Sequence, residues 1–273
     1  MSTVLISGAR GFIAGRLAES LREAGFHVLG LSRKAEPLPH FHQVFSAFLL
    51  NPIQGLFARE HVDAFIHCAY YTGKDEFEVN VNGTRLWSEQ AERNGVKRQI
   101  FFSSISAAVP AEGQSPYGRV KHELEEWFVR HNETVLRLGL VVGPGGLFQR
   151  MEDMVRTYRV LPIPDGGRAG VYLTEVDRLS DFVRDVLLGR RELSAGRVWN
   201  LFQPEQVTLA ALLRKIKKET NSRCLFIPVP SRLLLAAATV AEKCPFLKLQ
   251  VNRNNLIGLR RNDRLDLKSD FDS

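Results

Sequence analysis

A tyrosine and a lysine four residues apart, Tyr117 and Lys121, carry the clearest chemical signal in this sequence. Residues at this spacing lie on one face of a helix, one turn from each other. A free tyrosine has a pKa of ~10 and is a poor acid–base catalyst near neutral pH. An adjacent ammonium favours the phenolate and lowers that pKa, so the pair predicts proton transfer at a hydroxyl or ketone. The same spacing also occurs in ordinary exposed helices, so the neighbouring motifs must show whether this pair is catalytic.

Two serines, Ser103 and Ser104, follow an apolar run at residues 100–102, and Tyr117 comes thirteen residues after Ser104. Ligands of parallel sheets bind beyond the carboxyl ends of the strands, where these hydroxyls are expected to lie. Either serine could be the one that contacts the substrate.

A glycine-rich turn, with Gly8 and Gly11, follows the first apolar run directly. Glycine lets the chain reverse tightly and lets a pyrophosphate approach the backbone. A helix that starts near Gly11 would point its free N–H groups at the phosphates, while Phe12 and Ile13 anchor it to the sheet. This strand–turn–helix context predicts dinucleotide binding.

The end of the second strand should select the cofactor, because an acid there binds the ribose of NAD and an arginine accommodates the 2′-phosphate of NADP. Residues 29–34 contain no acid and end in Arg33 and Lys34. Arg33, with Arg10 as a second cation, predicts NADP, with NAD as the alternative. Arg33 could instead stack on adenine.

Short apolar runs alternate with amphipathic stretches through the first half of the chain, which is typical of a parallel sheet with helices on both faces. The predicted fold is α/β: a Rossmann-type doubly wound parallel sheet with a smaller C-terminal substrate lobe. We expect residues 1–160 to form the dinucleotide-binding domain and 161–273 a lobe interleaved with it. The expected strands are 3–7, 28–32, 64–68, 99–103, 134–141 and 197–201, with a third-strand region at 46–50. The expected helices are 12–23, 78–93, 176–189 and 209–219.

The composition is that of an ordinary globular protein of 273 residues, with a formal charge of +7. Its basic residues are spread along the chain, so we expect no nucleic-acid partner. Three cysteines without metal-ligand spacing fit a cytoplasmic location, and seven histidines without HxxxH or HExxH spacing predict no metal site. No membrane partner is expected, because the apolar segment at 232–242 favours burial within the lobe over an interfacial helix. The charged residues 251–273 are expected to be partly disordered.

Several motifs together resemble the extended short-chain dehydrogenase/reductase family, the NAD-dependent epimerase/dehydratase group that acts on nucleotide sugars. The resemblance covers roughly residues 3–205 and rests on these segments: 7–14 for the TGxxGFIG turn, 63–69 for DxVIHxAA, 80–84 for NVxGT, 143–145 for the turn after a later strand, 172–177 for FIHVDD and 199–201 for the YNLG strand.

The resemblance implies a role for each matching position. Ser104 would bind the substrate oxygen, Tyr117 would be the acid–base and Lys121 its electrostatic partner that also holds the ribose. The cofactor would be lined by Gly8, Gly11, Phe12, Ile13, Ala69 and Asn80. The residues themselves add further expected contacts: Arg10, Arg33, Tyr70 and Ser103 to the cofactor, and Tyr71 and Arg150 to the substrate. Arg137 could also reach the substrate diphosphate. Tyr70 and Tyr71 stand where the family often has small residues. A homodimer is a family-level expectation.

The resemblance leaves several activities open. The predicted reaction is reduction of a 4-keto-sugar with Tyr117 as the proton donor, favoured by Arg33 and the short substrate half. A 4-epimerase with tightly bound NAD is the alternative. A dehydratase is disfavoured because residues 105–108, after Ser104, include no Asp or Glu. An alternative of another class is an NADP(H)-sensing regulator or scaffold; such chains usually lack a catalytic residue, whereas Ser104, Tyr117 and Lys121 are all present.

Overall fold

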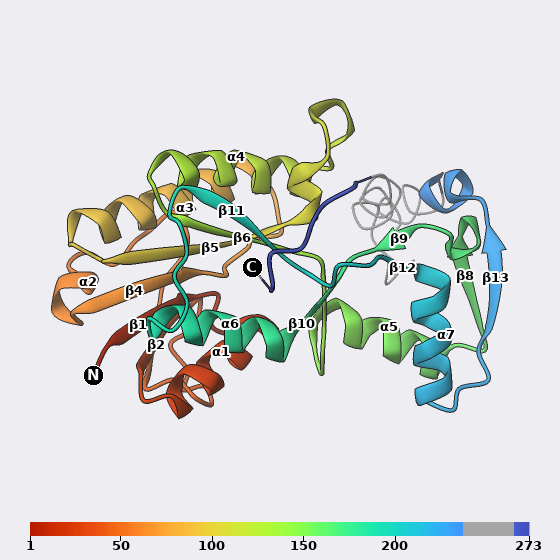
Figure 1. The fold of residues 1–273 in the computed structure, drawn as a ribbon, viewed down its shortest axis with the longest axis horizontal. Helices are drawn as coiled ribbons and strands as arrows, with labels where there is room; N and C mark the ends of the chain where they lie inside the picture. The colour runs from red at the N-terminus through yellow and green to blue at the C-terminus, as the bar shows by residue number, and fades with distance from the viewer. Residues whose placement is uncertain (237–264, 273) are drawn as a thin grey trace.

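A seven-stranded parallel sheet forms the centre of the larger part of the molecule (Figure 1). The computed structural model describes residues 1–236 and 265–272. The strand order β11-β6-β5-β4-β1-β2-β3 and the parallel pairing confirm the predicted Rossmann-type fold. The strands are β1 (Thr3–Ser7), β2 (His27–Ser32), β3 (Gln43–Ser46), β4 (Val62–His67), β5 (Arg98–Ser104), β6 (Thr134–Leu138) and β11 (Arg197–Leu201).

Helices cover both faces of this sheet. On one face α1 (Phe12–Glu23) packs against α6 (Val176–Leu187); α2 (Leu56–Arg59), α3 (Glu76–Arg93) and α4 (Pro116–Arg130) cover the other. Strand β1 shows why its three central residues are all apolar: Val4 and Ile6 join the core under α1 and α6, whereas Leu5 joins the core under α2 and α3. Side chains of a strand alternate between faces, so a strand buried on both sides needs apolar residues at every position.

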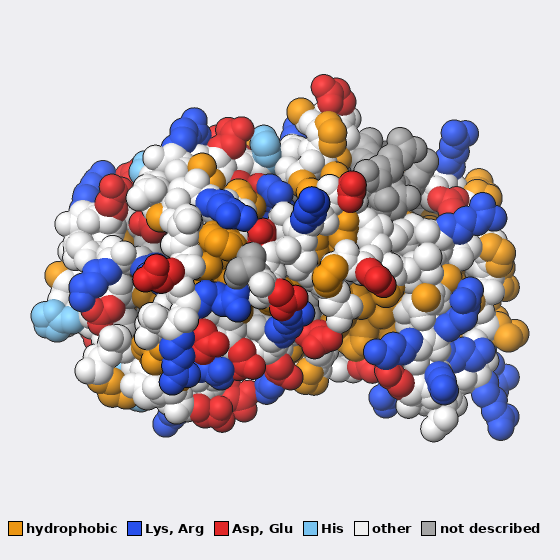
Figure 2. Space-filling model, viewed as in Figure 1, with side chains coloured by type: hydrophobic (Ala, Val, Ile, Leu, Met, Phe, Trp, Pro, Cys, Tyr) orange, Lys and Arg blue, Asp and Glu red, His pale blue; other side chains and the backbone are white. Residues whose placement is uncertain are grey.

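Among the described residues, the smaller lobe contains two helices of more than ten residues, a helical stretch at 231–236 and three two-stranded sheets around its own apolar core. Figure 2 shows Lys and Arg side chains gathered at the end of the molecule that this lobe forms. Its elements are α5 (Gly146–Thr157) and α7 (Leu209–Glu219), with the pairs β7 (Leu140–Val142) and β10 (Leu173–Glu175), β9 (Gly170–Val171) and β12 (Val207–Thr208), and β8 (Val160–Pro164) and β13 (Leu225–Val229).

The chain returns from the lobe to the large sheet, because α6 packs on α1 and β11 pairs with β6. One strand was expected at residues 134–141, but Gly139 divides it into β6 and β7. A Cβ at Gly139 would lie 2.3 Å from the Tyr172 carbonyl oxygen. The backbone N–H of Gly139 donates to the Thr174 side-chain oxygen Oγ1 at 2.9 Å. At Gly139 the chain therefore bonds to the segment that contains Tyr172 and Thr174, and the strand pairing of β6 does not continue into β7.

Two further expectations need correction. The third strand was expected at residues 46–50, but β3 spans Gln43–Ser46 and so begins three residues earlier. Residues 265–272 pack on the large domain, with Phe271 only 3% exposed and the Asp270 N–H donating to the Asn200 carbonyl at 2.8 Å, so this part of the tail is ordered. Residues 251–264 and 273, and the 237–242 part of the apolar segment, lie outside the described residues. Within the described part of the chain, no helix has the length and apolarity needed to cross a membrane.

Candidate active site

The turn between β1 and α1 has the backbone geometry expected for a phosphate site. Gly8 has a φ of +70°, and a Cβ there would lie 2.9 Å from the backbone of Ala69, so only glycine fits without strain. Gly11 precedes the first residue of α1, and no side chain caps that helix end. The first N–H groups of α1 therefore remain available to an anion. Ser7 Oγ accepts hydrogen bonds from the Cys68 and Ala69 N–H groups, which joins the end of β4 to this turn.

Phe12 and Ile13 have different surroundings. Ile13 packs on the core beneath α1, as expected of an anchor. The Phe12 ring lies against the glycine turn after β7, where a Cβ at Gly143 or Gly145 would come within 2.9 Å or 2.3 Å of its carbon atoms. Phe12 thus connects the βα turn to the start of the lobe, and its contact with a cofactor stays a prediction.

The end of β2 contains an acid that sequence reasoning missed. Glu36, four residues beyond the strand, forms an ion pair with Arg10 and lies 3.9 Å from Lys34 Nζ. Arg10, expected to assist Arg33 in binding a phosphate, therefore already has a carboxylate partner. The Arg33 side chain is exposed. The signal for Glu36 is an acid in the loop directly after residues 29–34.

Tyr117 and Ser104 meet where η1 (Ile105–Ala108) follows β5. Helix α4 begins at Pro116, its N-cap Ser115 accepting from the Gly118 N–H at 3.1 Å, and this places Tyr117 in the first turn. A Cβ at Gly118 would lie 2.6 Å from the Ser106 carbonyl oxygen, so glycine permits the close approach of α4 to η1. The Ser104 side chain lies close enough to the Tyr117 hydroxyl to lower its pKa.

Lys121 lies one turn further along α4 and is only 6% exposed. Its Nζ donates to the Phe102 carbonyl of β5 at 2.6 Å and lies 5.8 Å from the centre of the Tyr117 ring. The structure therefore brings Ser104, Tyr117 and Lys121 together at the carboxyl end of β5.

Burial controls the protonation of this group. It raises the pKa of Tyr117 to about 12, against a smaller lowering by the Ser104 hydrogen bond. It also lowers the pKa of Lys121 to about 8. At neutral pH the phenol is therefore neutral and the lysine still charged, which gives a proton donor beside a cation.

Ser103 is buried, and its Oγ has no hydrogen-bond partner among the described residues. An unsatisfied buried hydroxyl is unfavourable unless a ligand or water completes it. Together with the glycine turn and the open end of α1, this hydroxyl fits a bound dinucleotide whose ribose or nicotinamide offers polar groups.

Asn80 holds the wall of this site from α3. It is 1% exposed; its Oδ1 accepts from the Tyr71 N–H, and its Nδ2 donates to the carbonyls of Tyr71 and Glu76. The Tyr70 ring consequently faces Tyr117, with the two ring centres 4.9 Å apart, while the Tyr71 ring turns toward Phe48.

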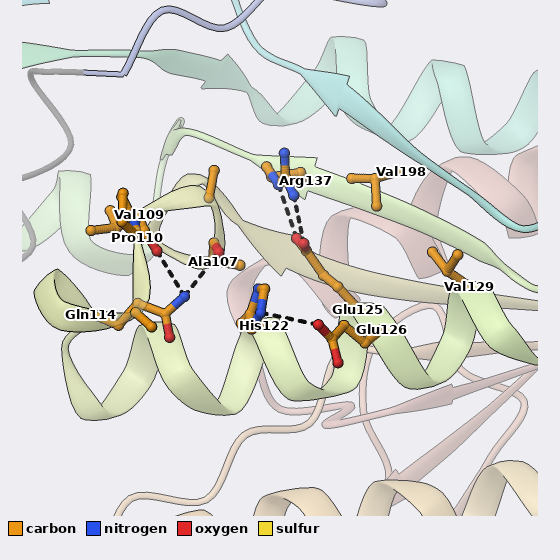
Figure 3. A pocket seen from close by; sticks show the side chains of 12 residues that line it. Ala107, Val109, Pro110, Gln114, His122, Glu125, Glu126, Val129, Arg137 and Val198 are labelled. Atoms are coloured by element: carbon orange, nitrogen blue, oxygen red, sulfur yellow. Dashed lines mark hydrogen bonds and ion pairs between the residues drawn. The ribbon is translucent and has the colours of Figure 1, made fainter.

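A separate pocket of about 320 Å³ lies between α4, η1 and the edge of the sheet (Figure 3). Tyr117 and Lys121 are not among its lining residues. Inside it Arg137 forms a two-bond ion pair with Glu125, so Arg137 is not free for a substrate diphosphate. Arg150 is exposed on α5, and its role stays a prediction. Among the described residues, no cluster of His, Cys, Asp or Glu could hold a metal ion.

Two curated relatives align with most of the chain. One is the N-acetyl-alpha-D-glucosaminyl-diphospho-ditrans,octacis-undecaprenol 4-epimerase of Escherichia coli O157:H7, 23% identical over 85% of this chain and 77% of the relative. The other is the 2-alkyl-3-oxoalkanoate reductase of Stenotrophomonas maltophilia, 26% identical over 78% of this chain and 74% of the relative.

Solved structures share the fold. The UDP-glucuronic acid 4-epimerase from Bacillus cereus, in complex with UDP-glucuronic acid and NAD, superposes with a TM-score of 0.70 at 18% identity, over 96% of this chain and 98% of that one. The model of the NAD dependent epimerase/dehydratase family matches residues 4–183, more than half of the chain. This match confirms the resemblance found in the motifs, and the protein belongs to the NAD dependent epimerase/dehydratase family.

Proposed function

We propose that this protein reduces a keto group on a nucleotide sugar, with Tyr117 as the proton donor. The observation that carries the proposal is the contact of a half-buried, neutral phenol with Ser104, one helical turn from the buried, charged Lys121. A phenol that stays protonated at neutral pH suits the reductive direction, in which a proton must be given to oxygen.

Each of the three residues has a defined task. Ser104 Oγ hydrogen-bonds the substrate carbonyl oxygen beside Tyr117. Tyr117 transfers its hydroxyl proton to that oxygen as the carbonyl carbon becomes a carbinol, and the Lys121 ammonium stabilises the phenolate that remains. The bound dinucleotide supplies the hydride that the carbon receives. Gly8, Gly11 and the first turn of α1 would hold its pyrophosphate, and Ser103 would satisfy one of its polar groups.

The relatives support a sugar substrate. The names of the Escherichia coli and Bacillus cereus epimerases describe a diphosphate-linked sugar and UDP-glucuronic acid. A substrate of this class carries a diphosphate, for which the exposed Arg150 on α5 is the proposed contact.

We propose NAD as the cofactor in place of the NADP expected from the sequence. Arg10 is paired with Glu36, which leaves Arg33 as the remaining predicted phosphate contact, and the Glu36 carboxylate would repel a 2′-phosphate. The family description and the Bacillus cereus complex also name NAD.

A 4-epimerase that retains NAD is the second candidate, favoured by the carboxylate at Glu36 and by the same three residues, which serve both directions of hydride transfer. A regulator or scaffold is less well supported, because all three side chains needed for catalysis are present and in contact or one turn apart. A homodimer and a cytoplasmic location stay predictions.

One experiment separates these functions. The purified protein is denatured and assayed for released NAD or NADP; the intact protein is then given NADH and a UDP-4-keto-sugar while reduced-nicotinamide absorbance is followed. Loss of absorbance that Tyr117→Phe abolishes supports the reductase. Retained NAD with sugar isomerised at constant absorbance identifies the epimerase. Binding of neither dinucleotide contradicts both enzymatic functions.

A further inference from the structure

Tyr70 occupies a position beside the catalytic group that three independent contacts define. Its ring stands edge-on to the Tyr117 ring at 4.9 Å and 65°. Lys121 Nζ lies 5.5 Å from the centre of the same ring. The Tyr70 hydroxyl donates to Glu76 Oε1 at 2.5 Å.

Glu76 fixes Tyr70 from outside the catalytic group. It is the first residue of α3, and its carbonyl accepts from Asn80, the same buried side chain that clamps Tyr71. The backbone on both sides of the Tyr70–Glu76 bond is therefore held by one asparagine. Burial, and secondly the bond to Glu76, raises the pKa of Tyr70 above its ordinary value, so this hydroxyl remains a donor.

The Lys121 ammonium is enclosed by aromatic rings. Besides Tyr70 and Tyr117, the Phe101 ring lies 4.6 Å from Nζ, and Nζ donates a hydrogen bond to the Phe102 carbonyl. A ring face attracts a cation, and the three rings together keep water from it. Tyr70 differs from the other two rings in having a carboxylate that locks its orientation.

We propose that Tyr70, braced by Glu76, is a positioning residue that holds the Tyr117 ring and the Lys121 ammonium in the arrangement that proton transfer requires. This inference rests on the proposed function, since it concerns the same catalytic group. Tyr70 transfers no proton in this scheme; it acts through the two residues that its ring touches. This role could not be predicted from the sequence, because Glu76 is separated from Tyr70 by a turn whose path only the structure shows.

The test compares Tyr70→Ala, Tyr70→Phe and Glu76→Gln with the wild type. The matched control is Glu78→Gln, the same chemical change on an exposed residue of the same helical turn. Two readouts are used: the pKa of Lys121, followed by NMR in protein with 13C-labelled lysine and assigned with Lys121→Met, and kcat and KM for NADH-dependent reduction of a UDP-4-keto-sugar.

Removing the Tyr70 ring admits water to Lys121. Desolvation is the largest cause of its lowered pKa, so Tyr70→Ala should raise that pKa by about one unit. Other groups near Lys121 remain in every variant: Cys68, His67, Glu125 and Tyr117. We expect kcat to fall at least about tenfold with KM little changed, smaller changes in the same direction for Tyr70→Phe and Glu76→Gln, and none for Glu78→Gln.

An unchanged Lys121 titration in Tyr70→Ala would overturn the proposal, as would a change in KM alone, which would make Tyr70 a passive wall. If Tyr70→Ala does not fold, the proposal is judged from Tyr70→Phe and Glu76→Gln. A wild-type kcat and a wild-type Lys121 pKa in both variants would refute the positioning role of Tyr70. The NMR readout needs no substrate. A wild type that reduces no sugar would thus defeat the proposed function while the Lys121 titration still judged the positioning role.

Discussion

The buried ion pair between Arg137 and Glu125 should be essential to stability, although it lies outside the catalytic group. Glu125 projects from α4 and Arg137 from β6, with side chains 5% and 15% exposed. Arg137 Nε and Nη2 donate to the two carboxylate oxygens in the forked arrangement that arginine favours. We predict that Arg137→Met will destabilise the protein strongly.

The magnitude follows from what the substitution leaves behind. Methionine keeps much of the apolar stem of arginine, so lost packing contributes little. The Glu125 carboxylate, however, loses its cation and two hydrogen bonds while it stays buried. Breaking one side of such a pair costs about 3–5 kcal/mol, a large part of a typical stability of about 5–15 kcal/mol. In Arg137→Met with Glu125→Leu neither charge of this pair is left buried, and this double variant should recover most of the loss.

Urea denaturation followed by circular dichroism measures the effect, with both single variants and the double variant treated as a cycle. The exposed pair Arg93–Glu89 on α3 is the control; Arg93→Met should change stability by less than about 1 kcal/mol. A loss below about 1 kcal/mol for Arg137→Met, or a double variant no more stable than the single one, would refute the argument that an uncompensated buried carboxylate dominates.

Four other outcomes are expected. The rate of reduction should fall as the pH rises through about 8, where Lys121 loses its proton, and a rate that stays constant to pH 10 in a folded protein would exclude its electrostatic role. Gly8→Ala should abolish NAD binding measured by calorimetry, because the positive φ and the 2.9 Å approach to Ala69 leave no room for a methyl group. Glu36→Gln should improve NADPH binding relative to NADH by about tenfold, and an unchanged ratio would remove Glu36 from cofactor selection. Phe271→Ala should lower stability by about 3 kcal/mol in thermal or urea unfolding, whereas a partly disordered tail would show no loss.

The centre of the sheet could be predicted because its inner strands are buried on both faces and therefore have apolar sequences. The bounds of α1 were also predicted correctly from the apolar period and the glycine that follows. Other elements lack such signals: α5 comes directly after a glycine-rich turn that suggests a loop, and β3 has only one buried side chain, Val44. Their existence depends on partners distant in the chain.

Some residues of the candidate site could be predicted from the sequence, and others could not. Ser104, Tyr117 and Lys121 were found because their types and spacing have a chemical use. Glu36 and Glu76 were missed, because each reaches its partner across a loop whose path no short-range pattern fixes.

Helix α4 explains why chemistry and stability meet on one element. Tyr117, Lys121 and Glu125 follow at intervals of four, and two of them bond to neighbouring strands: Lys121 to the Phe102 carbonyl of β5, Glu125 to Arg137 of β6. Apolar contacts alone would let the helix rotate slightly or slide at small cost, because they are non-directional. Two charged, directional bonds to different strands remove that freedom. The phenol in the first turn is consequently held in register with Ser104, so Arg137→Met should lower kcat as well as stability.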